Sequence, residues 1–451
     1  MPLAKTIADR GSCVCWSPYS ERRELLALGT KEGIGANGFD DYGGRLEIYD
    51  LDFSGGADKA PKLLATIETK QRFGSIAWGP HGKLKGGIIC GGMTDGTVKL
   101  WDAQKLIDGS PDAHIVDCKT HDRCVQALEF NPHPNMSHIL ATGGADNQVY
   151  IIDLSNPTTP NPVLPATMER AGQWHNAAVN TLAWNPQVAH ILASAADDGT
   201  CIVWDLKNNK TFCTLQQPLR LRYSDIAWNP NEGFQIITAI ADDSKPLLQV
   251  WDLRKSTTAP FKELQGHTRA VLNIAWNKND TNILASCGED GKTLIWDLFL
   301  GQPISEVETP KSENSSEQQQ APERPQESMS ANDLFSFGDS TPRALTGEGD
   351  RRNNSVAWAT HVPGVLACCT FDKRVNVFSL HGIGGQKPPK YMRRPAGASF
   401  GFGGRYASFG CPEKGQASQV ALNSHTSDSA TVVRAKKYLE TAAQTPLREI
   451  C

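Results

Sequence analysis

The chain has 451 residues, of which 39% are hydrophobic and 21% charged, and its formal net charge is −4 at pH 7. This is enough apolar material for a sizeable core, and the weakly acidic balance gives no reason to expect a nucleic-acid-binding protein. Residues 1–12 lack the apolar run of a signal peptide, and no stretch approaches the roughly 18 apolar residues of a spanning helix.

The 12 cysteines predict neither disulfides nor a metal site. Cys90, Cys201 and Cys287 lie inside apolar runs, where cysteine acts as a small hydrophobic residue. No Cys-x-x-Cys motif occurs, and the remaining close pairs lack partners at zinc spacing. We therefore expect a cytosolic protein with reduced thiols and without metal or cofactor.

One pattern recurs seven times along the first 380 residues. Each repeat opens with an aromatic residue and a turn, at Trp16, Trp78, Phe130, Trp184, Trp228, Trp276 and Trp358. A second signature, typically an aromatic or aliphatic residue followed by aspartate, comes usually 20 to 23 residues later and decays to Phe378-Ser379 in the last repeat. Between them, stretches such as "ILASAADDGTCIVWD" (residues 191–205) predict a strand, an Asp-Gly turn and a second strand.

Each repeat thus supplies three clear strands, and a weaker fourth strand such as "KELQGH" leads into the next repeat. Units of four strands ending in Trp-Asp resemble the blades of WD-repeat proteins, which implies an all-β, seven-bladed WD-repeat β-propeller over residues 1–380. An open ring would expose two sheet edges, so the segment around Leu3–Ile7 is the candidate for the strand that completes the seventh blade.

The repeats also account for residues that look catalytic. Three histidines lie nine residues before an opening aromatic, and three aspartates lie in the turns before the second signature: His121, His175, His267, Asp146, Asp198 and Asp290. In WD-repeat blades such residues form a buried hydrogen-bond network, and His267, Ser286, Asp290 and Trp296 match that pattern in the sixth repeat. A catalytic set would normally occur once, so the recurrence favours a structural role and no enzyme activity is expected.

The spacing is interrupted before the seventh repeat. Residues 302–350 contain "KSENSSEQQQAPERPQESMS", whose low apolar content predicts a disordered insert. Its one apolar island, Asn332–Gly338, has two open interpretations: a short docking motif, or a piece that packs back on the ring.

A second region follows the ring. A basic, Pro-rich linker covers 381–397, and "GASFGFGGRYASFG" (397–410) predicts a hairpin with a two-residue turn at Gly403-Gly404. With a third strand at Ala417–Asn423, the segment 398–424 is a small sheet with apolar residues on both faces. A helix is expected to begin near Ser429, in the segment 428–451. Composition alone leaves two interpretations: the sheet enters another protein's incomplete propeller, or it packs on its own ring or on later helices.

A resemblance favours the first interpretation. Residues 387–404, after a seven-repeat ring, closely resemble the outer-cage subunits of the COPII vesicle coat (the secretory protein thirty-one family), and residues 181–195 and 362–380 are similar to the same family. The resemblance implies a structural coat protein in ER-to-Golgi transport, peripheral on the cytosolic face of ER exit sites and vesicles. In that family the segment after the propeller donates a blade to a small six-bladed WD-repeat partner, secretory protein thirteen. The residues carried over to that inserted blade are Ser399, Phe400, Phe402, Tyr406, Ala407 and Phe409.

The resemblance also implies contacts with other copies of the outer coat at cage vertices, and indirect contact with the inner coat. An α-solenoid and a Pro-rich region follow the blade in that family, whereas this chain stops at Cys451. The expectation is therefore the N-terminal part of a longer protein, or a short form. The competing function is a WD-repeat adaptor of another kind, such as a ubiquitin-ligase substrate receptor or a chromatin-associated scaffold.

Overall fold

The computed structural model describes residues 5–7, 12–31, 43–53, 60–163, 175–208, 210–217, 219–307, 353–370, 374–379, 397–400, 405–409 and 420–424. The chain divides into two compact units, Met1–Gln386 and Lys387–Cys451.

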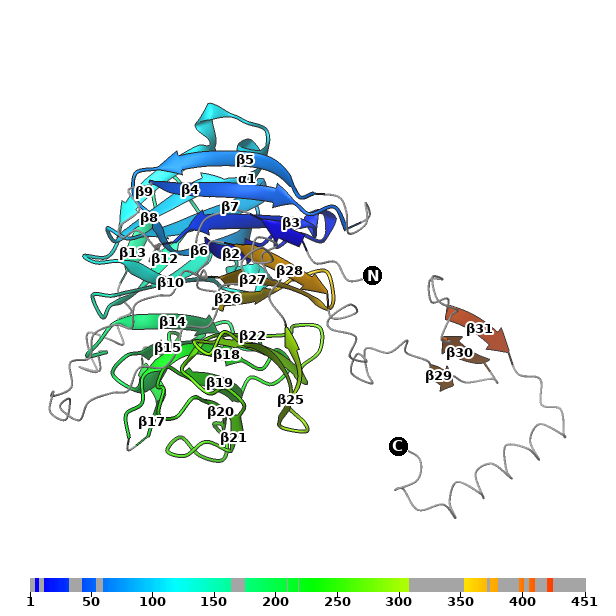
Figure 1. Ribbon diagram of the computed structural model, residues 1–451. Coiled ribbons are helices and arrows are strands. Elements are labelled where there is room, and N and C mark those ends of the chain that lie inside the picture. Colours follow the sequence, from blue (N-terminus) through cyan, green and yellow to red (C-terminus); the bar gives the residue numbers. More distant parts are fainter. Residues whose placement is uncertain are drawn as a thin grey trace, which may run out of the picture. The chain divides into compact units, whose positions relative to one another are not determined.

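Among the described residues, the first unit contains seven four-stranded antiparallel sheets, which are the blades of a propeller (Figure 1). Blade one contains β2 (Ser12–Trp16), β3 (Leu25–Thr30), β4 (Gly44–Asp50) and β5 (Lys62–Thr69). Blade two contains β6 (Phe73–His81), β7 (Leu84–Met93), β8 (Thr97–Asp102) and β9 (His114–Lys119). Blade three contains β10 (Val125–Phe130), β11 (Ile139–Gly144), β12 (Val149–Asp153) and β13 (Asn161–Val163).

The remaining blades repeat this order. Blade four contains β14 (Val179–Trp184), β15 (Ile191–Ala196), β16 (Thr200–Asp205) and β17 (Lys210–Gln216). Blade five contains β18 (Tyr223–Trp228), β19 (Gln235–Ile240), β20 (Leu247–Asp252) and β21 (Lys262–Gln265). Blade six contains β22 (Val271–Trp276), β23 (Ile283–Gly288), β24 (Thr293–Asp297) and β25 (Gln302–Val307).

Blade seven closes the ring. It contains β26 (Asn353–Trp358), β27 (Val365–Thr370) and β28 (Val375–Ser379), and its fourth strand is β1 (Lys5–Ile7) from the other end of the sequence. β1 pairs with β28 in the register Lys5↔Val377 and Ile7↔Val375. The expected seven-bladed all-β ring and its closing strand are confirmed.

Short helical segments lie in several of the connections between strands. They are η1 (Ser20–Arg22), α1 (Ala103–Ile107), η3 (Pro111–Ala113) and η4 (Pro134–Met136). Asp102 of the blade-two signature caps α1, because its side chain accepts hydrogen bonds from the backbone N–H groups of Gln104 and Lys105.

The core lies between adjacent blades. One cluster joins Ala127 and Val149 of blade three to Leu182, Trp184 and Trp204 of blade four. The tryptophans of four second signatures are at most 1% exposed: Trp101, Trp204, Trp251 and Trp296. A blade cannot bury both of its faces alone, so the ring is stable only as neighbouring blades stack.

The Asp-Gly and Asp-Asn turns form as expected. Asn147, Gly199 and Gly291, each directly after the turn aspartate, have φ angles of +69°, +72° and +78°. Glycine and asparagine adopt this left-handed conformation at the lowest cost, which explains their presence at these positions.

One expected boundary is corrected. The disordered insert was expected to start at residue 302, but residues 302–307 form β25, whose Ile304 and Ser305 are half-buried. The sequence of residues 302–307 is too polar to be recognised as a strand, because β25 is the outermost strand of its blade and is exposed on one side. Residues 308–352 lie outside the described part of the chain, as do Asn332–Gly338, most of the linker 381–397, and 428–451.

The second unit contains a three-stranded antiparallel sheet in the order β29 (Gly397–Phe400), β30 (Arg405–Phe409) and β31 (Val420–Ser424). The expected strand order is present, but the two-residue turn is wrong. Phe400 pairs with Tyr406. The connecting sequence 401–405 therefore has an odd number of residues, and Gly403 is its middle residue. A two-residue turn at Gly403-Gly404 would instead pair Phe400 with Ala407, and such a one-residue shift exchanges the two faces of a strand.

Candidate functional site

The small sheet places most of the expected partner-binding residues on its first two strands. Ser399 pairs with Ala407, and Phe400 pairs with Tyr406. Phe409 pairs with Gly397 on one side and with Val420 on the other. β30 is therefore the central strand, while β29 and β31 each have one edge without a partner strand among the described residues. Phe402 lies outside those residues.

The four residues expected to form a network in blade six are brought together by the structure. The indole N–H of Trp296 donates to the Ser286 hydroxyl oxygen over 2.7 Å, and that oxygen lies 2.6 Å from Nε2 of His267. Nδ1 of His267 lies 3.1 Å from both carboxylate oxygens of Asp290. Every polar group is satisfied when His267 is neutral, donates from Nδ1 to Asp290 and accepts at Nε2 from Ser286.

Blade four contains the same arrangement. His175 Nε2 lies 2.7 Å from the Ser194 hydroxyl oxygen, which also accepts from the Trp204 indole over 2.8 Å. Its Nδ1 lies 3.4 Å from Asp198. In blade three, His121 binds Asp146 over 2.9 Å and the Thr142 hydroxyl over 2.9 Å.

These sets have the order of a Ser-His-Asp triad, but they cannot act as one. Ser286 and Ser194 are fully buried, so no substrate reaches either hydroxyl. The buried sets instead satisfy polar groups inside a blade and fix the turn between its second and third strands.

The protonation equilibria of these groups fit this role. Burial lowers the pKa of His121 below its usual range, against the opposing effect of Asp146. Burial alone would raise the pKa of Asp198 and of Asp290, but hydrogen bonds outweigh this effect and hold both pKa values below the usual range. For Asp198 these bonds come from His175, Thr200 and the backbone of Asn176. For Asp290 they come from His267 and the backbone of Thr268.

A second network, which the sequence did not reveal, joins the innermost strands of blades four to six. Asp225 accepts from the Thr181 hydroxyl over 2.7 Å in blade four, and from the Asn273 side chain over 2.6 Å in blade six. It also accepts from the backbone N–H groups of Ile226 and Ile274, each over 2.9 Å. Burial raises the pKa of Asp225 to about 6. A sequence signal was available, because Thr181, Asp225 and Asn273 each lie three positions before an opening tryptophan.

The opening tryptophans also link blades. The indoles of Trp184, Trp228 and Trp358 donate to carbonyl oxygens of the preceding blade over 3.1, 2.9 and 2.9 Å. Trp16 does the same across the closure, to Ala357 over 3.0 Å. Trp78 and Trp276 differ, because their indoles donate to carbonyl oxygens of their own blades, those of Gly86 and Thr281, each over 2.9 Å.

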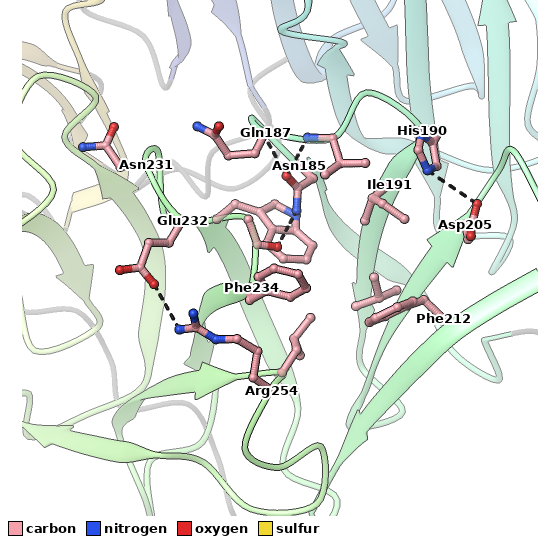
Figure 2. A pocket seen from close by; sticks show the side chains of 15 residues that line it. Asn185, Gln187, His190, Ile191, Asp205, Phe212, Asn231, Glu232, Phe234 and Arg254 are labelled. Atoms are coloured by element: carbon pink, nitrogen blue, oxygen red, sulfur yellow. Dashed lines mark hydrogen bonds and ion pairs between the residues drawn. The ribbon is translucent and has the colours of Figure 1, made fainter.

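The ring also has a pocket of about 510 Å³ between blades four and five (Figure 2). Its apolar lining includes Ile191, Phe212 and Phe234, and the two phenylalanines are 50% and 48% exposed. The Asn185 side chain donates to the Gly233 carbonyl over 2.8 Å and so fixes the two loops that frame it.

Charged pairs stand at two points of the pocket rim. Arg254 binds Glu232 over 3.2 Å, and its guanidinium carbon lies 5.6 Å from the centre of the Phe234 ring. His190 lies 3.9 Å from Asp205, and in Figure 2 this pair and Glu232 lie on opposite sides of Phe234. Sequence reasoning missed this pocket, because it is assembled from loops of two different repeats.

No cluster of three or more histidine, cysteine or acidic side chains in the described part of the chain has the geometry to hold a metal ion. Burial raises the pKa of the Cys13 thiol to about 11, and that of Cys369 well above its usual range. Neither thiol is therefore an activated nucleophile. None of the helices described is long and apolar enough to cross a membrane.

Comparison with protein families identifies the repeats. The family "WD domain, G-beta repeat" matches residues 62–102, 113–153, 170–205 and 258–297. The first match begins with β5 of blade one and continues through β6, β7 and β8 of blade two. A sequence repeat is therefore offset by one strand from a blade, so consecutive blades share a repeat.

Curated relatives match almost the whole chain. The chain is 32% identical to "Protein transport protein SEC31" of Dictyostelium discoideum over 446 residues, which is 90% of this chain and 31% of that protein. It is 35% identical to "Protein transport protein sec31" of Aspergillus clavatus over 451 residues, 98% of this chain and 34% of that protein. For "Protein transport protein Sec31A" of Danio rerio the identity is 32% over 416 residues, 88% of this chain and 32% of that protein.

Solved structures share the fold. A chain of "COPII on membranes, outer coat vertex" has a TM-score of 0.66 and 22% identity, and the match covers 93% of this chain and all of that chain. A chain of "The structure of the COPII coat assembled on membranes" has a TM-score of 0.65 and 21% identity, with coverage of 99% and 60%. The chain spans about a third of the length of the curated relatives it matches. Over nearly its whole length, this WD-repeat chain is a homologue of the Sec31 proteins.

Proposed function

We propose that the chain is a structural subunit of the COPII outer coat, and that it supports ER-to-Golgi protein transport through protein–protein contacts rather than catalysis. The homology to proteins named as protein transport proteins supports this proposal. The likeness of its fold to chains of the assembled coat, one at an outer-coat vertex, agrees with it. In this role the chain is peripheral to the membrane, on the cytosolic side of ER exit sites.

The observation that carries the proposal is the three-stranded sheet after the ring. The ring already has seven complete blades, so β29, β30 and β31 are not needed to close it. A three-stranded sheet with edges that lack partner strands in the described residues can be extended by backbone hydrogen bonds to another chain. Its strands carry aromatic and aliphatic residues at paired positions, such as Phe400 with Tyr406 and Ala407 with Leu422.

The partner in this proposal is the small six-bladed WD-repeat coat subunit, secretory protein thirteen. The sheet would serve as the additional blade of that incomplete propeller, where both of its faces would be covered. Ser399, Phe400, Phe402, Tyr406, Ala407 and Phe409 are the proposed contact residues. Other copies of the outer coat are further proposed partners, and the inner coat an indirect one.

Affinity capture of the co-expressed partner tests the proposal. Tyr406→Asp or Phe402→Asp would place an unpaired charge between stacked blades, so either variant should abolish recovery of the partner. The melting temperature of the ring should not change, because these residues lie after it. Leu219→Asp, at an exposed position of the ring, is the control that should recover the partner as the wild type does. Equal recovery of the partner by Tyr406→Asp and wild type would refute the inserted-blade assignment.

A further inference from the structure

An exposed segment of alternating leucine and arginine connects blades four and five. It is Leu219–Arg222, with the sequence Leu-Arg-Leu-Arg, and we term it the LRLR segment. It lies between β17 and β18. Leu219 is 60% exposed, and both arginines are exposed as well. An apolar side chain flanked by exposed cations suits a ligand that is both apolar and acidic.

The LRLR segment is held in a fixed shape. The backbone N–H of Arg220 donates to the carbonyl oxygen of Gln217 over 3.1 Å, and the carbonyl oxygen of Arg222 accepts from the backbone N–H of Ala241 over 2.9 Å. Arg220 has a φ angle of +45°, which is uncommon for a residue other than glycine. Such backbone strain persists where the surrounding structure enforces it, and it is concentrated at binding sites.

Neither arginine of the segment forms an ion pair in the described part of the chain. The Arg222 side chain donates to the carbonyl oxygen of Ala241 over 3.4 Å, and no side-chain partner of Arg220 occurs among the described residues. Asp242, which follows Ala241, accepts instead from the backbone and the hydroxyl of Ser244 over 2.8 and 2.5 Å. The two positive charges are therefore available to an anionic ligand.

The chain itself contains a ligand of matching chemistry. Outside the described residues, the insert follows Val307, and residues 308–340 include seven acidic and two basic side chains. Its apolar island and the next residue, 333–339, have the sequence DLFSFGD, with three large apolar side chains between two aspartates. This composition complements the LRLR segment in both polarity and charge.

The insert also starts on the same face of the ring as the LRLR segment. Both connect the fourth strand of one blade to the first strand of the next, and strand direction alternates identically in every blade. Two blades separate the two connections, which at roughly 10 Å per stacked sheet amounts to about 20–30 Å. Between Val307 and Asp333 there are 25 residues, and between Asp339 and Asn353 there are 13. Even the shorter link can span up to about 45 Å, so the sequence 333–339 can reach the LRLR segment.

We infer that residues 333–339 bind the LRLR segment of the same chain, with their apolar side chains packed on Leu219 and their aspartates paired with Arg220 and Arg222. Because ligand and site belong to one molecule, the effective concentration reaches the millimolar range, and a contact of modest intrinsic affinity is still occupied. The ion pairs are exposed, so added salt should weaken the contact. This site lies apart from β29, β30 and β31 and does not depend on the coat assignment.

Timed digestion of the full chain with chymotrypsin tests the inference. The protease cleaves after Phe335 and Phe337, and it can do so only while these residues are undocked. Leu219→Asp and Arg220→Glu should each speed cleavage at the two sites at least about fivefold. Leu63→Asp, at a 46% exposed leucine of blade one, is the matched control and should be cleaved at the wild-type rate.

An exchange of charges separates a specific contact from a general effect of charge. Asp333→Arg with Asp339→Arg should speed cleavage as Arg220→Glu does. Combining these two changes with Arg220→Glu and Arg222→Glu should restore slow cleavage, because the ion pairs form again with reversed signs. Arg123→Glu, at an exposed position in the connection between blades two and three, should have no effect.

Hydrogen exchange measures the same contact from the side of the ring. Phe337→Ser changes no residue of a blade, and it should quicken backbone exchange in the LRLR segment. Equal cleavage of the wild type and Leu219→Asp, or exchange in the segment that Phe337→Ser leaves unchanged, would overturn the inference. Protection that rises with protein concentration would assign the site to the insert of another copy. Protection seen only with vesicles of anionic phospholipid would assign it to a membrane surface, and either result would refute binding within one chain.

Partner capture keeps the two proposals apart. Leu219→Asp should recover the small WD-repeat subunit as the wild type does, whether or not residues 333–339 dock. A chain that protects Phe335 and Phe337 but never captures that subunit would contradict the inserted blade alone. A chain that captures the subunit without this protection would contradict the LRLR contact alone.

Discussion

The indole N–H of Trp16 donates to the carbonyl oxygen of Ala357 over 3.0 Å, and it thereby joins the first blade to the last across 341 residues of sequence. The His361 ring nitrogen Nε2 lies 2.9 Å from the carbonyl oxygen of Pro18, at the same junction. The closure of the ring therefore depends on side chains of blades one and seven as well as on β1.

Trp16→Phe should weaken this closure specifically. The substitution keeps an aromatic ring but removes the donor, and one lost hydrogen bond costs about 1 kcal/mol of the free energy of unfolding. Hydrogen exchange should quicken in β1 and β28 before other strands. Trp276→Phe is the matched control, because its indole binds within its own blade. If both variants accelerate exchange in β1 equally, the Trp16 contact has no special part in closure.

Asp225→Asn should destabilise the ring strongly. All four groups bound to the Asp225 carboxylate are donors: the Thr181 hydroxyl, the Asn273 amide and the N–H groups of Ile226 and Ile274. An asparagine amide would direct its own donors at two of them, which should lower the free energy of unfolding by about 2–4 kcal/mol. Denaturant titration measures the loss, and Asp112→Asn at an exposed position should change it little. A near-neutral Asp225→Asn would show that the inner network contributes nothing to stability.

The pH dependence of unfolding should report on Asp198. Its folded-state pKa lies below the ordinary value of 3.8, so its contribution to stability is present above that value and is lost as pH falls through it towards the lower folded-state pKa. Between pH 5 and 3, Asp198→Asn should therefore lose less stability than the wild type loses. Thermal unfolding at successive pH values checks this difference. Parallel curves for the two proteins would mean that the hydrogen bonds from His175 and Thr200 do not favour the charged carboxylate.

Deleting Lys311–Ser330 should leave the melting temperature of the ring nearly unchanged. The segment is too polar to contribute a core, and shortening a long connection changes its closure entropy by only about 0.5 kcal/mol. Scanning calorimetry of the deletion and the intact chain compares them directly. A fall of many degrees would mean that this part of the insert packs on the ring.

Sequence alone determined the elements that repeat. Seven opening aromatics, seven second signatures and turns such as Asp198-Gly199 fixed the number of blades, because each signature forms by local hydrogen bonds and apolar periodicity. Residues of the same types recur at equivalent positions of other repeats, and this recurrence also indicated that His267, Ser286, Asp290 and Trp296 form a network. These features can be predicted from the sequence because the contacts that define them form among residues close together in the chain.

Only the tertiary structure revealed the contacts between different repeats. The bond from Trp16 to Ala357, the donors around Asp225, and the pocket between Ile191 and Phe234 join residues whose nearness follows from the stacking of blades. The register of Phe400 with Tyr406 was likewise set by pairing along whole strands rather than by the Gly403-Gly404 dipeptide. Residues 302–307 read as loop by composition and became β25 because a neighbouring strand supplied their hydrogen bonds, and no local pattern encodes the presence of that neighbour.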